Sequence, residues 1–475
     1  MTYKITVFNT LGREYQEFKT ITPGLVKMYI CGPTVYDSAH LGHARTYIAF
    51  DAIIRFLEYM GYRVIYVRNI TDVGHIREES GMDRMIHGAE RERRHPMEVA
   101  DKYMMEFFKD MDMLGVRRPD IQPRASMVIP EIIDAVHKLI EKGFAYTVDG
   151  SVYFEVSKFD GYGRLSRIKI SELQRHRLEP DPRKKSPGDF ALWKEAPPNY
   201  PLVWRSPWGL GFPGWHIECS VMSMKYLGEQ IDVHGGGHDL VFPHHENEIA
   251  QSEALSGKSP FVRYWLHTGE LTVEGQGMHK SLGNYITIRE ALRRYSPDLI
   301  RLFILSSHYR SPIDFSEKAM AQARENLEKI VDALNLLSEA SDGGGDELAN
   351  SVALDVEEFK SAMCNDFNTP SALAAIYAAA DKVRAHIGMG RPVGTPSKVA
   401  GMILEMCNAL GLLRGFTPVR LAVEAEKVLK VLLDVRRELR RRGLYEIGDE
   451  IRSRLAEIGI KVEDTRDGER VRLTL

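Results

Sequence analysis

Two histidines stand three positions apart in the segment Cys31–His43, whose sequence is CGPTVYDSAHLGH. The segment lies where an apolar run gives way to a helical pattern, and the amides and dipole of a helix N-terminus attract phosphate groups. The imidazoles of His40 and His43 can stabilise negative charge that develops on an α-phosphate. Gly42 lets a planar base or a phosphate approach the backbone. Histidines at this spacing are nevertheless more often ordinary surface or core residues.

A second pattern suited to phosphate is the loop Met278–Asn284, which follows glycines at positions 275 and 277. A helix is predicted to begin near Ile288, directly after this loop. Lys280 can form an ion pair with phosphate groups. A single loop lysine is usually only solvated, so this motif gains weight only together with the first.

Side chains that bind metals cluster in a third region. Residues 214–219 read GWHIEC, and His234–Glu248 reads HGGGHDLVFPHHENE. His244 and Glu248 are four positions apart and can share one face of a helix. Taken singly, Cys219 is equally well a small buried apolar residue and Glu248 a surface carboxylate.

The elements that position these motifs begin with a buried strand at Val26–Ile30, a helix at Ala44–Met60 that ends at Gly61, and a second strand at Arg63–Arg68. This order predicts a βαβ unit with parallel strands and a right-handed crossover. Ligands of such sheets bind at the carboxyl ends of the strands. The first motif begins at that end.

The remainder of the chain has a less uniform pattern. Helices are predicted at Pro96–Leu114 and Pro130–Lys142, followed by a strand pair within Ala145–Val156 that is split by Asp149 and Gly150. Residues 158–201 are rich in Arg, Lys and Pro, which is typical of an insertion. Helical periodicity dominates from residue 317 onward. We therefore expect an α/β half with an insertion and a mostly helical C-terminal half.

Composition narrows the class of protein. A chain of 475 residues exceeds what one hydrophobic core usually serves, and 44% hydrophobic with 27% charged residues is typical of a soluble globular protein. We find no signal peptide and no apolar run of about 18 residues, so membrane contact is not expected. Four scattered cysteines indicate a reducing cytosol rather than a disulfide framework.

The net charge of −3 gives no global sign of a nucleic-acid partner, so any such contact must rest on local basic patches. The predicted helix Val419–Arg442 carries a candidate patch. Its arginines are Arg436, Arg437, Arg440, Arg441 and Arg442. They can meet phosphates or form a solvated helix end that compensates the dipole, and the sequence favours neither.

Together the first two motifs resemble the signatures of class I aminoacyl-tRNA synthetases, HIGH at His40–His43 and KMSKS at Gly277–Ser281. Gly277 and His279 depart from the family pattern, in which a lysine and a serine stand at these positions. Lys258 or His279 could replace part of the missing charge. The resemblance implies catalytic roles at the phosphates for His40, His43 and Lys280, and an ATP site formed by His40, Gly42, His43, Met278, Lys280 and Ser281.

The third region, with Cys31, resembles the cysteinyl-tRNA synthetase family almost residue for residue. The resemblance implies one Zn²⁺ per subunit, held by Cys31, Cys219, His244 and Glu248. It also implies that Trp215 walls the side-chain pocket, and that Asp239 with Thr71 or Asp72 holds the substrate amine. Zinc binds a thiolate readily and a serine hydroxyl poorly, so the metal would select cysteine without an editing domain.

The resemblance extends over nearly the whole chain, and the C-terminal segments Ile447–Leu455 and Gly459–Thr465 are similar to the family's anticodon-binding domain, although Val471 stands where many members have tryptophan. The implied fold is an α/β Rossmann-type parallel-sheet catalytic domain with an insertion, a helical bundle and a small anticodon-binding domain. The expected domains are the first half of the Rossmann domain at 1–129, a connective insertion at 130–202, the second half with the zinc site at 203–265, a stem-contact region with the KMSKS-like loop at 266–325, the bundle at 326–414 and the anticodon-binding domain at 415–475.

The implied reaction joins L-cysteine to ATP, with Mg²⁺, and then to tRNA(Cys), in a cytoplasmic monomer. Three alternatives stay open. A related ligase joins cysteine to an amino sugar in mycothiol synthesis but lacks the anticodon-binding end. A metallohydrolase built on His244–Glu246 would leave both ATP motifs unexplained. A non-catalytic tRNA-binding paralogue fits the altered positions 277 and 279.

Overall fold

The computed structural model of the chain describes residues 3–74, 83–169, 171–172, 181–278, 283–340, 342–416, 423–465 and 468–473. The chain forms two compact units. The first comprises Met1–Met320, Glu357–Ala374 and Cys407–Leu412, and the second comprises Ala321–Val356, Ala375–Met406 and Leu413–Leu475.

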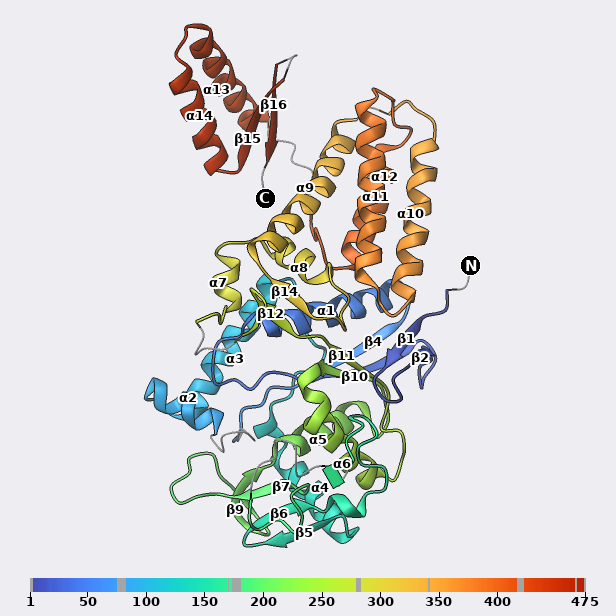
Figure 1. Ribbon diagram of the computed structural model, residues 1–475, viewed down its shortest axis with the longest axis vertical. Coiled ribbons are helices and arrows are strands. Elements are labelled where there is room, and N and C mark those ends of the chain that lie inside the picture. The colour runs from blue at the N-terminus through green and yellow to red at the C-terminus, as the bar shows by residue number, and fades with distance from the viewer. Residues whose placement is uncertain are drawn as a thin grey trace. The chain divides into compact units, whose positions relative to one another are not determined.

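A four-stranded parallel sheet lies at the centre of the first unit (Figure 1). Its strands are β3 (Leu25–Ile30), β4 (Arg63–Arg68), β10 (Ile231–Gly237) and β11 (Val262–Thr268), in the order β11-β10-β3-β4. Helix α1 (Leu41–Tyr59) connects β3 to β4, which confirms the predicted βαβ unit. The strands are mostly apolar and buried because helices cover both faces of the sheet.

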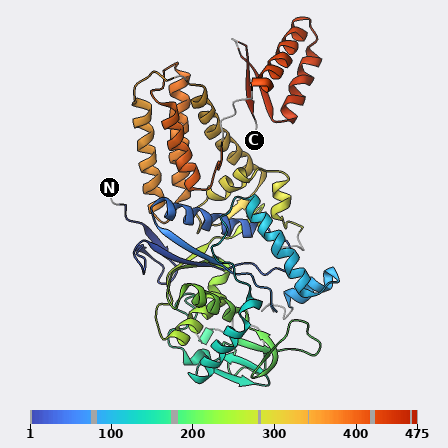
Figure 2. The same cartoon turned by 180° about the vertical axis from the view of Figure 1, so that it is seen from behind.

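Helices α1 and α5 (Trp215–Leu227) lie on opposite faces of this sheet, as Figures 1 and 2 show. Helix α1 is buried along most of its length because it lies between the sheet and α8 (Pro297–Leu305). A buried ion pair joins the two helices, with Arg301 Nη2 at 2.6 Å from Asp51 Oδ2. Helix α6 (Glu246–Ser256) packs against α5.

A second sheet is antiparallel and lies in and beyond the predicted insertion. Its order is β5-β6-β7-β9-β8, made of β5 (Ala145–Val148), β6 (Ser151–Phe154), β7 (Phe190–Glu195), β8 (Trp204–Ser206) and β9 (Gly209–Pro213). The predicted strand pair is confirmed as β5 and β6. Asp149 and Gly150 form the turn between them with φ of 44° and 76°, the left-handed region that glycine and aspartate tolerate. Helix α4 (Ile129–Glu141) packs against α5 and α6.

The remaining elements of the first part of the chain are short or peripheral. They are β1 (Thr6–Asn9), β2 (Glu14–Glu17), α2 (Arg84–Glu92), α3 (Pro96–Met113), β12 (Leu271–Val273), β13 (Gln276–Gly277), α7 (Ile288–Leu292) and β14 (Ile313–Phe315). Helix α7 begins where the sequence predicted it, after the loop that contains the second motif.

Helices dominate the rest, as predicted. They are α9 (Glu317–Glu339), α10 (Glu347–Cys364), α11 (Thr369–Gly388) and α12 (Pro396–Ala409). The C-terminal segment forms α13 (Val423–Arg441), α14 (Tyr445–Glu457), β15 (Ile460–Thr465) and β16 (Gly468–Leu473). It has a small core of Leu429, Leu455 and Val462, against which Val471 packs.

One arginine of the candidate cationic patch does not reach solvent. Arg436 is buried and its Nε donates to the Gly448 carbonyl at 3.2 Å, so its side chain faces the domain interior. Acidic residues on α13 and α14 form ion pairs with other arginines of the patch. Asp449 lies 2.9 Å from Arg440, and Glu438 lies 2.8 Å from Arg442.

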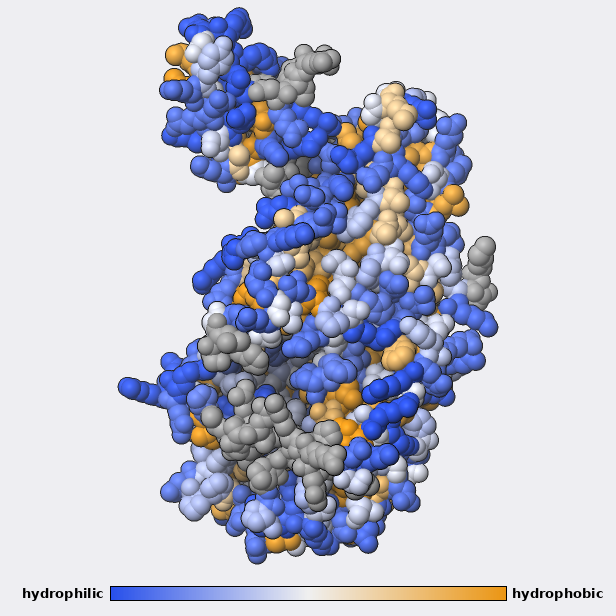
Figure 3. Space-filling view, viewed as in Figure 1, coloured by the Kyte–Doolittle hydropathy of each residue, from blue (hydrophilic) through white to orange (hydrophobic). Residues whose placement is uncertain are grey.

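The surface in Figure 3 is mostly hydrophilic, with hydrophobic residues in separate patches. Exposed apolar residues of the C-terminal segment include Val431, Val435 and Ile458. Within the described ranges, every helix is too short or too polar to cross a membrane.

Candidate functional site

A cavity of about 1040 Å³ opens at the carboxyl ends of the parallel strands. Each strand sends the chain that follows it to the cavity wall: Cys31 follows β3, Thr71 follows β4, Asp239 follows β10 and Gly269 follows β11. The cavity therefore occupies the sheet edge at which the sequence predicted a ligand.

His40 and His43 cap the N-terminus of α1 and line the cavity. The amide of Gly42 donates to His40 Nδ1 at 3.0 Å, and the amide of His40 donates to His43 Nδ1 at 3.2 Å. Because Nδ1 accepts in both rings, each neutral imidazole carries its proton on Nε2. Each ring thus keeps an N–H donor that the helix cap does not use.

Both rings are neutral near pH 7. Burial lowers the pKa of His40 to about 4. Burial, with the nearby His40 and Arg84, holds the pKa of His43 well below its usual range. The pair can therefore offer a phosphate hydrogen bonds but no full positive charge.

The structure shows a second reason for a glycine at position 42, which the sequence did not reveal. A Cβ at this position would lie 2.7 Å from Cε1 and 2.9 Å from Nδ1 of the His40 ring. A larger residue would displace the ring from its cap, so Gly42 is needed for the position of His40 itself.

The four predicted metal ligands meet although they come from three separate segments of the chain. One ligand atom each of Cys31, Cys219, His244 and Glu248 lies within 4.8 Å of all the others, and all four residues are buried. His244 Nε2 is 2.9 Å from Glu248 Oε1, and Cys31 Sγ is 3.8 Å from the same oxygen. Two sulfurs, an imidazole and a carboxylate form a donor set that suits zinc.

A second donor set overlaps the first and was not predicted. Cys31, His234, His245 and Glu248 also bring their ligand atoms within 4.8 Å of one another. His234 Nε2 is 2.8 Å from Glu248 Oε2, and His245 Nε2 is 3.3 Å from Cys31 Sγ. The two sets share Cys31 and Glu248. Only the predicted set has three members on the cavity wall, namely Cys31, Cys219 and His244.

The charges of the predicted set favour a bound cation. Burial opposes ionisation of Glu248, but His234 and His244 lower its pKa to about 2. Burial likewise opposes the charged form of His244, but Glu248 and Cys219 raise its pKa to about 10. For Cys219 burial is outweighed by the Cys31 thiol and His244, so its pKa falls to about 6. Two buried anions, the Glu248 carboxylate and the Cys219 thiolate, therefore lie beside the cationic imidazole of His244. A divalent ion bound to these groups could replace the positive charge of the imidazole.

Three of the four residues predicted to hold the amino acid lie on the cavity wall. The Trp215 ring stacks on the His244 ring with centroids 4.3 Å apart. Thr71 is buried, and its hydroxyl donates to Glu218 Oε2 at 3.0 Å. Asp239 is exposed at the end of β10.

Asp72, the stated alternative to Thr71, does not line the cavity. Its carboxylate is buried and pairs with Arg124 Nε at 2.7 Å, and it also accepts from the amide and hydroxyl of Ser126. Its role is to fix the chain that follows β4.

The second motif is only partly described. Met278 lines the cavity, and Gly277 belongs to β13. His279, Lys280 and Ser281 lie outside the described residues.

Several cavity residues were missed by the analysis of the sequence. Arg84, His87 and Arg91 of α2 line the cavity. Their spacing of three and four residues, which places them on one helix face, was the available signal. Glu218 was also missed. Burial raises the pKa of the Glu218 carboxyl well above its usual range, and this carboxyl accepts a hydrogen bond from the Thr71 hydroxyl.

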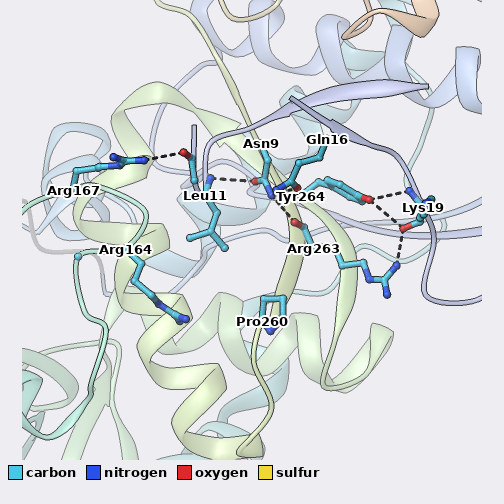
Figure 4. Close-up of a pocket in the computed structure, with 11 residues that line it drawn as sticks. Asn9, Leu11, Gln16, Lys19, Arg164, Arg167, Pro260, Arg263 and Tyr264 are labelled. Atoms are coloured by element: carbon cyan, nitrogen blue, oxygen red, sulfur yellow. Dashed lines mark hydrogen bonds between the residues drawn. The ribbon is translucent and has the colours of Figure 1, made fainter. Parts of the chain in front are cut away.

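A second cavity, of about 790 Å³, contains none of the predicted site residues (Figure 4). Its basic lining is engaged within the protein: Arg164 pairs with Glu253 at 2.6 Å, and Arg167 donates to the Gly12 carbonyl at 2.8 Å. Arg263 donates to the Lys19 carbonyl at 2.8 Å. These contacts hold the β1–β2 hairpin and the loop near residue 164 in place.

Solved structures of aminoacyl-tRNA synthetases share this fold. A Mycobacterium tuberculosis methionyl-tRNA synthetase in complex with methionyl-adenylate aligns with a TM-score of 0.60 and 14% identity, over 86% of this chain and 94% of its own. Residues 17–325 match the family of tRNA synthetases class I (C) catalytic domains, and residues 358–414 match the DALR domain. The fold and the catalytic-domain match define a class I aminoacyl-tRNA synthetase.

Curated relatives narrow the family. The cysteine–tRNA ligase of Thermococcus onnurineus is 46% identical over 98% of both chains, and that of Pyrococcus horikoshii is 46% identical over 97% of both. The cysteine–tRNA ligase of Chlorobaculum tepidum is 44% identical over 97% of both. The chain belongs to the cysteine–tRNA ligase family.

Proposed function

We propose that the chain activates L-cysteine with ATP to form cysteinyl-adenylate and pyrophosphate, and then transfers the cysteinyl group to tRNA(Cys). The observation that carries this proposal is a single cavity whose wall contains both the His40–His43 cap and the thiols Cys31 and Cys219. Adenylation requires a phosphate site and a cysteine site side by side, and the cavity brings candidates for both together.

In the first step the cysteine carboxylate attacks the α-phosphate and the α–β phosphoanhydride bond breaks. The Nε2–H groups of His40 and His43 donate to α-phosphate oxygens as charge builds on them, in a site fixed beforehand by the α1 cap. Lys280 would pair with the β- and γ-phosphates, and a bound Mg²⁺ would supply further positive charge there. In the second step a ribose hydroxyl of the tRNA attacks the acyl carbon, and AMP leaves.

Cys31, Cys219, His244 and Glu248 would hold Zn²⁺, which would offer the cysteine thiolate a soft Lewis acid and a serine hydroxyl a poor one. Three of these ligands line the cavity, so the cluster borders the space in which the substrate would bind. Trp215 closes the side-chain pocket by stacking on His244. Thr71 and Asp239 supply oxygens for the ammonium group.

We assign the catalytic domain halves to 1–129 and 203–265, the insertion to 130–202, the stem-contact region to 266–325, the bundle to 326–414 and the anticodon-binding domain to 415–475. The C-terminal segment with its own small core supports tRNA as acceptor over an amino sugar. We expect the enzyme to be a cytoplasmic monomer.

The test is cysteine-dependent exchange of labelled pyrophosphate into ATP by the purified protein, with serine and no amino acid as controls, before and after zinc chelation. We expect exchange only with cysteine, its loss together with bound zinc, and its return when zinc is restored. Absence of exchange in zinc-replete protein would contradict the proposal and favour a non-catalytic tRNA-binding protein.

A further inference from the structure

A network of hydrogen bonds runs through the cavity wall at Thr71. The Gly32 amide donates to Asn69 Oδ1 at 2.7 Å, and Asn69 Nδ2 donates to the Thr71 hydroxyl at 3.2 Å. That hydroxyl in turn donates to Glu218 Oε2 at 3.0 Å. The residues Asn69, Thr71 and Glu218 are buried, and the first two line the cavity whereas Glu218 does not. The Glu218 side chain therefore meets the cavity wall through Thr71.

The partners of the Thr71 hydroxyl determine what it can offer to a ligand. A hydroxyl has one hydrogen and two lone pairs. Glu218 takes the hydrogen and Asn69 takes one lone pair, so the contacts within the described residues leave the second lone pair unused. A ligand group that binds Thr71 from the cavity must therefore donate a hydrogen bond. An ammonium group only donates, whereas a carboxylate only accepts.

Both ends of this network lie next to the thiols of the predicted zinc site. Gly32 follows Cys31, and Glu218 precedes Cys219. A Cβ on Gly32 would lie 1.6 Å from the Asn69 carbonyl oxygen, so only glycine allows this contact. The amine and the sulfur of cysteine are attached to adjacent carbons. An acceptor for the amine must therefore be held close to the sulfur site, and the network supplies that connection.

Glu218 is a costly residue at its position on α5. It is fully buried, and its Oε1 atom has no hydrogen-bond partner among the described residues. An apolar side chain of similar length would avoid the loss of hydration that a buried carboxyl suffers. The hydrogen bond from Thr71 is the contact that such a side chain could not replace. The presence of the carboxyl is thus explained by Thr71 rather than by packing.

We propose that Glu218 is a positioning residue that directs the unused lone pair of Thr71 toward the α-ammonium group of cysteine. The inference rests on the proposed function, in which Thr71 contacts that ammonium group. Glu218 takes up the hydroxyl hydrogen, which would otherwise turn into the cavity and repel the ammonium. The site then favours thiols that carry an α-ammonium group over thiols that lack one, such as 3-mercaptopropionate.

The test separates the reach of the Glu218 side chain from the carboxyl itself. Glu218→Gln keeps an acceptor oxygen at the same reach, Glu218→Asp keeps a carboxyl but withdraws it from Thr71, and Glu218→Met has neither. The affinities of the zinc-loaded protein for L-cysteine and for 3-mercaptopropionate are measured by titration calorimetry. We expect the Asp and Met variants to bind cysteine about 10- to 100-fold more weakly, as for loss of a hydrogen bond to a charged group, and the Gln variant to stay close to wild type. The affinity for 3-mercaptopropionate should be unchanged in every variant.

Ser220→Ala is the matched control. Ser220 flanks Cys219 on the other side, and its buried hydroxyl donates to Gln251 Oε1 at 2.6 Å without lining the cavity. This variant should leave both affinities unchanged. Thr71→Val should weaken cysteine as much as Glu218→Met does, and the double variant should show no further loss. Bound zinc should equal that of wild type in each preparation, because Glu218 lies outside both donor sets.

Equal weakening of the two thiols, or loss of zinc, in Glu218→Met would overturn the inference, because Glu218 would then only support the fold of the site. Unchanged cysteine affinity in that variant would overturn it too. If Glu218→Met does not fold, the other two variants decide, and weak binding by Gln with wild-type binding by Asp would refute the role of reach. Absence of pyrophosphate exchange in a wild type that binds cysteine would instead refute the proposed adenylation alone, and a wild type that binds no cysteine would overturn both.

Discussion

The thiol cluster contains two donor sets that share Cys31 and Glu248. Cys219 and His244 complete the first set, and two histidines, His234 and His245, complete the second. Cys219 and His244 lie on the cavity wall, whereas His234 and His245 do not. A metal in the first set would contact the substrate space, and a metal in the second would be sealed behind it. Which side chains hold the ion therefore decides whether it can take part in cysteine selection.

We predict that Cys219→Ser and His244→Ala lower bound zinc to about a tenth or less, as loss of a direct ligand exceeds the 10- to 100-fold effects known for residues behind the ligands. His245→Ala should retain most of the metal. The measurement is zinc per chain by atomic emission after dialysis against a weak chelator.

Cys364→Ser is the matched thiol control, because Cys364 lies outside both donor sets. Zinc lost from His245→Ala but retained in Cys219→Ser would place the ion in the second set.

At the scale of elements, helix α1 carries the histidines of the proposed phosphate site and is also anchored in the core of the first unit. Its first residues form the imidazole cap, and two positions after His43 the buried Arg45 donates to the carbonyls of Ile304, His308 and Ser311. The cap therefore begins a helix whose position is fixed by the end of α8 and the chain that follows it. This support can hold the Nε2–H groups still while the charge on the phosphate changes.

The cap also makes stability depend on pH. His40 has a pKa of about 4 in the folded protein against an ordinary 6.5, so between these values the unfolded chain binds the proton that the folded chain excludes. The resulting stabilisation is complete above pH 6.5 and is lost as the pH falls toward 4. At pH 5 the loss amounts to about 2 kcal/mol.

We predict that His40→Asn reduces the pH dependence of urea unfolding between pH 7 and pH 5 by about this amount, because asparagine can cap a helix but does not titrate. His87→Asn, at an exposed ring on the same cavity wall, should leave the dependence unchanged. Equal pH dependence in wild type and His40→Asn would show that His40 does not exclude the proton.

At the scale of the whole molecule, the substrates of the proposed reaction differ greatly in size. We expect ATP and cysteine to bind in the cavity of the first unit and the tRNA to need further contacts on the chain. The C-terminal segment has a separate core and exposed residues that include Val431, Val435 and Ile458, and we expect it to supply such contacts. The burial of Arg436 shows that this surface is less basic than the sequence indicated.

We predict that a chain ending at Phe416 keeps cysteine-dependent pyrophosphate exchange but loses about 100-fold in kcat/KM for aminoacylation of tRNA(Cys), because one of two linked binding sites is removed. Both rates are measured on the same preparations, with the full-length chain as reference. Unimpaired aminoacylation would show that residues 417–475 do not bind the tRNA.

Much of this protein could be predicted from its sequence because the relevant signals are local. The apolar run before Cys31 and the helical periodicity after it place the His40–His43 pair at a strand-to-helix junction, and the structure confirms that junction. The turn at Asp149 and Gly150 was equally clear, because few residues tolerate positive φ. The family, too, follows from short motifs whose residues are contiguous.

Tertiary structure decided which distant residues meet. The family resemblance implied that Cys31 and Cys219 share one cluster, but no local pattern shows it, and the second set with His234 and His245 appeared only in the structure. The face of α2 that carries Arg84 became visible only once the helix lay against the cavity. Burial of Arg436 depends on how α14 packs on α13. The sequence determines chemistry and local conformation, whereas long-range packing determines which side chains share a site and which charges reach solvent.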